Sequence, residues 1–431
     1  MRLPIFARGP LLFFSLVPLL ACSDVADRST TPELAPAINA LGLDLYRQQA
    51  SRTPGAGLLL SPYSIATALA MTYAGAAGET KAEMARVLRL PEDAAACGRE
   101  FHRLNALLQD LMDESARNDA ELIKAGKAAT PLMLNAANRL YVQEGFKLRP
   151  DYVQLLSGQF GVTAGSADFR SNPEQARSQI NRWVAKFTHN RVPDLLPPGQ
   201  PDPTTRLALV NALYLKASWM NHFEKSLTRR EPFHLDARDS VNVPTMTRQA
   251  DFRGEQRDGY RVVAVPYDTG RLQFVLFVPD AVDGLAGLER KLTPGDLTRC
   301  NRLPQQDTIL YLPRFQLAPG TLALSDALQS LGMRRAFDRP AGSADFTGMA
   351  DRTDDSYLAI GGVFHQTWLS LDENGTEAAA ATAVTMVTFG AIANERPPRP
   401  VVVRADRPFL FAIQEVDSGV CLFLGRVTDP R

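Results

Sequence analysis

An apolar residue stands at every third or fourth position between residues 34 and 50. Leu34, Ile38, Leu41 and Leu45 carry this pattern. Such spacing places the side chains on one face of a helix. We therefore expect a first helix here, with its apolar face packed against the rest of the protein.

A short apolar strand followed by a buried helix is expected between Gly57 and Thr80. Three leucines lead into Ser61, and Pro62 follows it. A serine side chain can accept hydrogen bonds from the first helical amides, and proline fits the first turn, so this pair predicts a helix start. The helix continues to Tyr73 and is rich in alanine, which predicts close packing at the centre of the protein.

The stretch from Leu371 to Ala391 gives two conflicting indications. Ala378–Ala381 are strong helix formers, with Gly375 or Thr376 as a cap and Glu377 in the first turn. In a strand, one face would hold only small, uncharged residues, and Glu377 would lie on the other face, toward solvent. The residues of the uncharged face are Thr376, Ala378, Ala380, Thr382 and Val384. Alanine is a poor strand former, so local propensity favours the helix and only the flanking chain can reverse that interpretation.

Length and charge bound the class of protein. The chain has 431 residues, a formal net charge of zero and 45% hydrophobic residues, enough for one large or two ordinary domains. A neutral chain without a basic cluster predicts neither a nucleic-acid surface nor a heparin-type polyanion site. The arginines that recur are dispersed among acids, as on a solvated surface: Arg229, Arg230, Arg253, Arg257, Arg334 and Arg335.

The first residues have the pattern of an export signal. Arg2 and Arg8 accompany an apolar run from Leu11 to Leu20. The run is too short and too interrupted by proline to cross a membrane as a helix. We expect residues 1–21 to be a signal peptide that is removed.

A lipid attachment site is indicated at the end of that run. Leu19-Leu20-Ala21-Cys22 is similar to the bacterial lipobox, in which the cysteine becomes the lipidated first residue, and Ser23 is similar to the pattern passed on to the outer membrane. Several acyl chains would anchor the protein stably. We expect residues 22–33 to be a tether at the bacterial cell envelope; a plain secretory peptide and a secreted protein are the alternative.

Cysteine and histidine spacing gives no sign of a metal centre or of an enzyme. The cysteines after the signal are Cys97, Cys300 and Cys421, and an odd number leaves at least one thiol free. Cys421 lies in an apolar run and is expected to be a buried thiol. No CxxC, HExxH, GxSxG or Walker motif occurs. His365, in an apolar strand, is predicted to be a hydrogen-bonded core histidine, and we expect neither cofactor nor catalysis.

Several stretches, in the same order along the chain, resemble those of serpins, the serine-protease inhibitor family. They are Gly57–Thr80, Ala136–Val142, Phe146–Val153, Ile180–Val184, Leu209–Trp219, Leu312–Phe315, Leu328–Phe337, Ala344–Gly348, Asp406–Phe411 and Gly419–Thr428. The resemblance covers about residues 34 to 430. It implies one α+β domain over residues 34–431 with the serpin fold: three β-sheets, about nine helices and an exposed reactive-centre loop at about 373–396.

Within this resemblance, the conflicting stretch matches the hinge of inhibitory serpins. The hinge residues are Glu373, Gly375, Thr376, Glu377, Ala378, Ala379, Ala380, Ala381 and Thr382. Counting along the family spacing from Gly375 places the reactive bond at Phe389–Gly390. An aromatic residue there suits chymotrypsin-like proteases. Gly390 replaces the common serine and the stretch to Pro408 is longer than usual, so an adjacent bond or one at Met386 is the alternative.

The resemblance also implies two clusters in the main sheet. One, called the shutter, lies at mid-sheet and contains Ser61, Ser64, Asn211 and His365. The other, called the breach, lies at the top of the sheet and contains Trp219, Arg314 and Glu373, with the acid paired to the arginine.

The function implied is suicide inhibition of a serine protease by a monomer. The protease cuts the loop and forms an acyl-enzyme, and the loop then inserts as a new strand before water completes the hydrolysis. About 14 residues, at roughly 3.3 Å each, span about 45–50 Å, against a diameter of roughly 55 Å for a compact chain of this size. The uncharged hinge face favours inhibition over the alternative, a non-inhibitory, lipid-anchored serpin that acts as a binding or chaperone protein.

Overall fold

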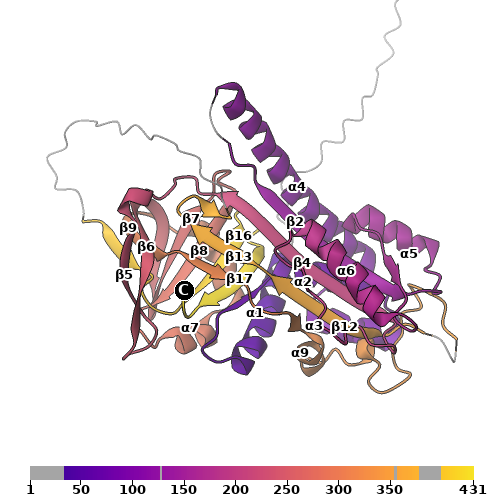
Figure 1. Cartoon of the computed structure of the whole chain (residues 1–431). Coiled ribbons are helices and arrows are strands. Elements are labelled where there is room, and N and C mark those ends of the chain that lie inside the picture. The colour runs from indigo at the N-terminus through magenta and orange to yellow at the C-terminus, as the bar shows by residue number, and fades with distance from the viewer. Residues whose placement is uncertain (1–33, 127–128, 354–356, 378–398) are drawn as a thin grey trace, which may run out of the picture. The chain divides into compact units, whose positions relative to one another are not determined.

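The computed structural model describes residues 34–126, 129–353, 357–377 and 399–431. The described residues form one compact unit. Nine α-helices occur in the described residues (Figure 1): α1 Ala35–Arg52, α2 Pro62–Tyr73, α3 Gly78–Leu88, α4 Ala94–Lys124, α5 Pro150–Leu155, α6 Pro173–Phe187, α7 Leu285–Lys291, α8 Pro294–Thr298 and α9 Ser325–Ser330.

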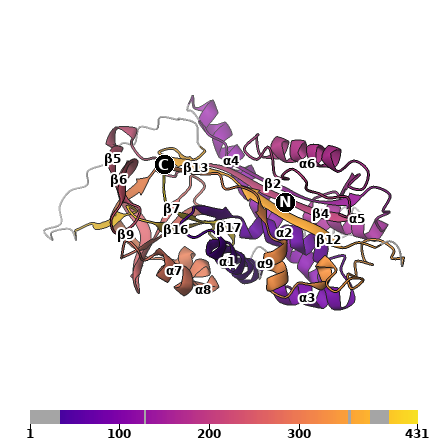
Figure 2. The ribbon, with the colours of Figure 1, turned by 60° about the horizontal axis from the view of Figure 1, so that its bottom comes forward.

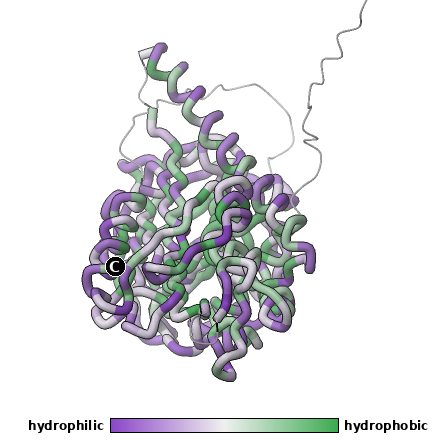
Figure 3. Tube along the Cα trace, turned by 90° about the vertical axis from the view of Figure 1, so that its right-hand side faces the viewer, coloured by the Kyte–Doolittle hydropathy of each residue, from purple (hydrophilic) through white to green (hydrophobic). Residues whose placement is uncertain are grey.

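The first two helices follow the apolar pattern of the sequence. α1 buries its leucine stripe, and α2 begins where Ser61 and Pro62 predict a helix start. The Ser61 hydroxyl accepts a hydrogen bond from the Ser64 amide at 3.1 Å, and every residue of α2 is buried. Both predictions are confirmed. The last turns of α4 project beyond its neighbours (Figures 1 and 3), and there Ile123 is 64% exposed.

The larger of two hydrogen-bonded strand networks contains most of the strands in the C-terminal half of the chain. Its strands, in spatial order, are β1 Leu58–Leu60, β17 Cys421–Val427, β16 Phe409–Glu415, β8 Leu272–Pro279, β7 Tyr260–Pro266, β6 Ser240–Arg257, β9 Gln305–Pro313 and β15 Val401–Arg404, with β5 Arg229–His234 beside β6. β6 is 18 residues long, and pairs with β5 through its first residues and with β7 through its last. Because this one strand continues through both parts, two of the three expected sheets merge into one network.

The second network, here called the main sheet, carries the candidate site. Its strands, in spatial order, are β10 Phe315–Leu317, β13 Leu369–Asp372, β14 Gly375–Thr376, β4 Leu207–Ser218, β12 Ile360–Thr367 and β11 Leu322–Ala323, with β2 Met133–Gln143 beside β4 and β3 Gly165–Ala167 beside β2. β4 and β12 run parallel, whereas β14 is antiparallel to both β4 and β13.

Helices cover both faces of the main sheet. α2 packs on one face, and α6 lies along the other face over β2 and β4 (Figure 2). α6 contributes Ala176, Ile180 and Val184 to a small apolar cluster with β4 and β12, whereas α2 belongs to the large core that the two networks share. Apolar residues gather in the interior of the unit and polar ones on its outer turns (Figure 3).

Several predicted features fall outside the described residues. These are the signal peptide and Cys22, the hinge residues from Ala378 to Thr382, and the reactive bond Phe389–Gly390. Among the helices that the structure describes, none is both long and apolar enough to cross a membrane.

Candidate functional site

Two hinge residues, Gly375 and Thr376, already form part of the main sheet. Gly375 pairs with Asp372 on one side and with Ser218 on the other, and Thr376 pairs with Leu371 and Ala217. Gly375 has φ +148°, and a Cβ atom there would lie 2.1 Å from the Ala217 carbonyl oxygen. Only glycine fits this close approach, so the chain can turn tightly into the sheet at this point.

Thr376 is anchored inside the protein. Its side chain is fully buried, and its hydroxyl lies 2.6 Å from the Tyr267 hydroxyl. Tyr267 stacks on Trp219 with ring centroids 4.7 Å apart. The sequence predicts that Thr376 enters the sheet only when the loop inserts. In the structure, Thr376 is already paired between β13 and β4.

Glu377 does not face solvent as the sequence suggested. Its side chain is only 13% exposed and its carboxylate lies 2.5 Å from the Arg191 guanidinium. The residue has φ +46°, and its amide donates to the Ser370 carbonyl at 2.9 Å. A charge partner therefore holds Glu377 at the point where it leaves the sheet.

The breach residues meet as the sequence predicts. Glu373 is 1% exposed and accepts hydrogen bonds from Arg314 Nε at 2.7 Å and from the Thr228 hydroxyl at 2.6 Å. Trp219 Nε1 donates to the Asp372 carbonyl at 2.9 Å. Burial raises the pKa of Glu373, but the hydrogen bonds from Thr228 and Arg314 more than offset it and hold that pKa below its usual range. The carboxylate is therefore charged at neutral pH and fixes the start of the hinge.

The shutter residues form one hydrogen-bonded cluster between α2 and the main sheet. His365 Nε2 accepts from the Ser61 amide at 2.9 Å, which leaves Nδ1 to donate to Asn211 Oδ1. Asn211 Nδ2 donates to the Ser64 hydroxyl at 2.6 Å. Burial lowers the pKa of His365 to about 3, so the ring is neutral. This is the hydrogen-bonded core histidine that the sequence predicts.

Asn138 of β2 completes this cluster, although neither its sequence context nor the resemblance assigned it to the shutter. Its Oδ1 accepts from the Ser64 hydroxyl at 2.7 Å and from Asn211 Nδ2 at 2.5 Å. The signal was present, because a buried asparagine in the middle of an apolar strand needs polar partners. Tyr267 and Arg191 carried no comparable signal, since their partners are distant in sequence.

The strands that flank the hinge are already in register for a longer strand. Six residues before Leu371 and Ala217, the two partners of Thr376, stand His365 and Asn211, and these are themselves paired across β12 and β4. A strand that continued from Thr376 between β4 and β12 would place Thr382 between Asn211 and His365. No strand would have to slip along its neighbour.

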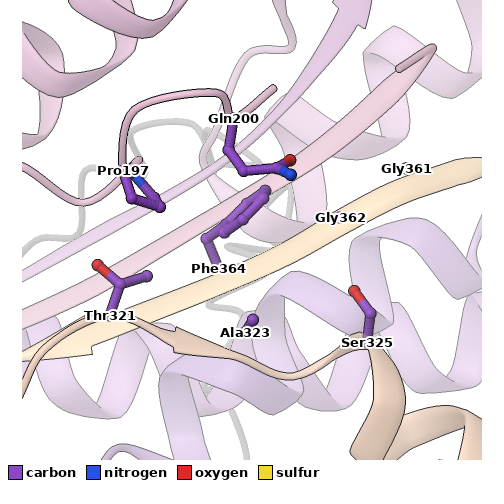
Figure 4. A pocket seen from close by; sticks show the side chains of 8 residues that line it. All are labelled: Pro197, Gln200, Thr321, Ala323, Ser325, Gly361, Gly362 and Phe364. Atoms are coloured by element: carbon purple, nitrogen blue, oxygen red, sulfur yellow. The ribbon is translucent and has the colours of Figure 1, made fainter. Parts of the chain in front are cut away.

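Two other features offer no catalytic chemistry. A pocket of about 200 Å³ lies between the α6–β4 connection and β12 (Figure 4), and none of its lining residues is ionisable: Pro197, Gln200, Thr321, Ala323, Ser325, Gly361, Gly362 and Phe364. Cys97, Cys300 and Cys421 are buried free thiols, and burial raises the pKa of Cys97 and of Cys300 to about 12. No group of residues in the described ranges could hold a metal ion.

Comparison with known proteins identifies the family. Residues 36–430 match the sequence profile of the family described as serpin (serine protease inhibitor). The chain belongs to the serpin family. An uncharacterized serpin-like protein of Thermococcus kodakarensis is 34% identical over 95% of this chain and 88% of its own length. The leukocyte elastase inhibitor of Equus caballus is 32% identical over 92% of this chain and 100% of its own length.

Solved serpins have the same fold. Serpin48 of the insect Tenebrio molitor, described as highly specific, superimposes with a TM-score of 0.78 and 27% identity over 93% of this chain and 98% of its own. The expected α+β serpin fold is therefore confirmed. Serpins are in general protease inhibitors rather than catalysts, which agrees with the lack of enzyme motifs in this sequence.

Proposed function

We propose that this serpin inhibits chymotrypsin-like serine proteases by inserting its cleaved loop into the main sheet. The observation that carries the proposal is the position of β14. Two hinge residues already occupy the slot between β13 and β4, and the register beyond them is continuous as far as Gly362 and Ala208. Every second residue from Thr376 to Val384 is uncharged, so the strand face that turns inward can enter the same interior without burying a charge.

The chemistry proposed is that of an interrupted hydrolysis. The protease serine attacks the carbonyl carbon of Phe389, the Phe389–Gly390 bond breaks, and the amine of Gly390 leaves with a proton from the protease histidine. The acyl ester that remains ties Phe389 to the protease. Insertion of the loop then competes with the attack of water on that ester, and the protease is trapped when insertion is faster.

Insertion requires the β4–β12 pairing and the shutter to open. The hydrogen bond between His365 and Asn211 spans the two strands that must separate. The Thr382 hydroxyl would arrive between these two side chains and can both donate to one and accept from the other. The hydrogen bond between His365 and Asn211 would thus be replaced by two hydrogen bonds to the Thr382 hydroxyl, and no buried polar group would be left unpaired.

Replacing Phe389 by arginine is expected to shift the inhibited protease from chymotrypsin to trypsin. An apolar specificity pocket rejects the charged side chain, whereas a pocket with an acidic floor accepts it. We expect the rate of covalent-complex formation with chymotrypsin to fall by about a hundredfold or more, and SDS-resistant complexes with trypsin to appear on denaturing gels. The matched variant is Met386→Arg. If that variant shifts the specificity and Phe389→Arg does not, the reactive bond lies at Met386.

We propose in addition that Cys22 anchors the protein in a membrane, at the outer membrane of a bacterial cell envelope. The support is the lipobox-like sequence that ends at this cysteine. Cys22→Ala is expected to move the protein from the membrane fraction to the soluble fraction, or to block its processing, and to leave inhibition unchanged. Ser23→Ala retains the cysteine and should stay in the membrane fraction. A wild-type protein found wholly in the soluble fraction of its native cells would contradict the anchor.

A further inference from the structure

Next to the inserted hinge residues, β4 separates from the strand that runs from β12 into β13; this point is called the fork. β4 and β12 pair as far as Leu213 and Thr367, and beyond that point β14 stands between β4 and β13. The next residue on each side is aromatic. Tyr214 and Trp368 therefore flank the fork, and both are buried, at 4% and 9% exposure.

The turn that follows α6 lies over this fork. Its two consecutive residues His189 and Asn190 have φ +48° and +61°, a conformation that costs free energy outside glycine. Thr188 fixes the turn, because its hydroxyl donates to the Val184 carbonyl at 2.9 Å and accepts from the Val192 amide at 3.2 Å. The turn thereby places the His189 side chain against β4 and the Arg191 side chain against Trp368.

Each of these side chains covers one of the flanking rings. The His189 ring stacks on Tyr214 with centroids 4.8 Å apart, and His189 Nε2 lies 3.2 Å from Asn135 Nδ2 of β2. The Arg191 guanidinium lies 4.5 Å above the Trp368 ring, within the range of a cation–π contact. One short turn thus contacts β2, β4 and Trp368, the residue between β12 and β13.

The same arginine binds the last described residue of the hinge. Arg191 donates to the Glu377 carboxylate at 2.5 Å, a charge-assisted bond to a side chain that is 13% exposed. Burial first, and then this carboxylate, raise the pKa of Tyr214. The chain leaves the sheet at Glu377 through a left-handed conformation.

We propose that these five residues, His189, Arg191, Tyr214, Trp368 and Glu377, form a clasp that stops hinge insertion after two residues. To insert further, Glu377 must give up its left-handed conformation and its pairing with Arg191. Ala379, by register, must then pass between Tyr214 and Trp368, whose rings are covered by the clasp. The clasp therefore sets how readily the uncut loop enters the sheet, a regulation that rests on the proposed strand insertion.

The test uses neutral replacements of the two charged members. Arg191→Met and Glu377→Gln remove the ion pair with little change of size, and the double variant tests whether they act through each other. Arg182→Met is the matched control, because Arg182 lies exposed on α6 and has no ion pair or hydrogen bond to any described residue. All variants are made in the whole chain, and folding is checked first by thermal unfolding.

Two readouts separate the clasp from the inhibitory function. Hydrogen exchange of the Glu377 amide, which now donates to Ser370, should be at least about tenfold faster in either variant than in wild type, because a charge-assisted hydrogen bond of this kind is lost. Conversion of the uncut protein on warming, to a form that unfolds at higher temperature and resists loop cleavage, should also be about tenfold faster. The double variant should be no faster than the single ones.

Each outcome decides one of the two claims. Exchange and conversion at wild-type rates in Arg191→Met and Glu377→Gln would overturn the clasp, as would slower conversion or effects that simply add in the double variant. A wild-type protein that neither converts nor traps any protease would refute the proposed function. In that case the exchange of the Glu377 amide still decides whether the clasp holds the hinge.

Discussion

Thr376→Arg is expected to turn the protein from an inhibitor into a substrate. Thr376 is fully buried and its hydroxyl is bound to Tyr267, so an arginine there would place an unpaired charge in the interior at a cost of several kcal/mol. The hinge would be forced out of the sheet. Cleavage at Phe389 needs only an accessible loop, so it should continue.

The effect on trapping should be large because insertion and hydrolysis compete. A rise of about 1.4 kcal/mol in the barrier to insertion slows it tenfold, and the cost here is greater. We expect covalent complex to fall at least about tenfold on denaturing gels while cleaved inhibitor accumulates. Thr376→Ser, which keeps the hydroxyl and a small volume, should trap protease like wild type. Equal trapping by Thr376→Arg would show that strand insertion is not the mechanism.

Glu373→Lys is expected to loosen the top of the main sheet and to promote association between copies through the loop and the sheet. The variant puts a second cation beside Arg314 at a site that is 1% exposed and leaves the Thr228 hydroxyl without its acceptor. Removing a charged partner of this kind costs about 2–3 kcal/mol, less than for a fully buried pair because Arg314 is 42% exposed.

The measurement is the size distribution after mild heating, together with the apparent free energy of unfolding. Glu373→Lys should form oligomers at a temperature where wild type stays monomeric. Combining it with Arg314→Glu restores opposite charges and should recover part of the stability. The normal carboxylate has a depressed pKa, so its contribution is present above the pKa of the unfolded chain and is lost as the pH falls through the folded value. A monomeric Glu373→Lys protein with normal inhibition would contradict this role of the pair.

The sequence predicted the fold and the shutter and breach positions better than it predicted the state of the hinge. Ser61 and Pro62 set the start of α2 by local chemistry, and the resemblance to serpins placed Asn211, His365, Trp219 and Arg314, whose contacts the structure then supplied. Alternation along the hinge separated Thr376 from Glu377 correctly, but parity tells only which face a residue takes. It does not tell what lies over that face.

The features that could not be predicted depend on residues far apart in the sequence. The Arg191–Glu377 pair joins positions separated by 186 residues, and nothing local marks Arg191 as its partner. The partial insertion of Gly375 and Thr376 likewise balances the burial of two residues against the bending of the chain, and it depends on Tyr267, which directly follows β7. Asn138 was the exception, because its polarity within an apolar strand was visible in advance.

A structure of the protein after cleavage of the loop at Phe389 would test strand insertion directly. We expect a new strand between β4 and β12, antiparallel to both, with the Thr382 hydroxyl within hydrogen-bond distance of Asn211 and His365. Asn211 and His365 should no longer contact each other directly. A cleaved protein in which β4 and β12 still pair, with the hydrogen bond between His365 and Asn211 intact, would contradict inhibition by strand insertion.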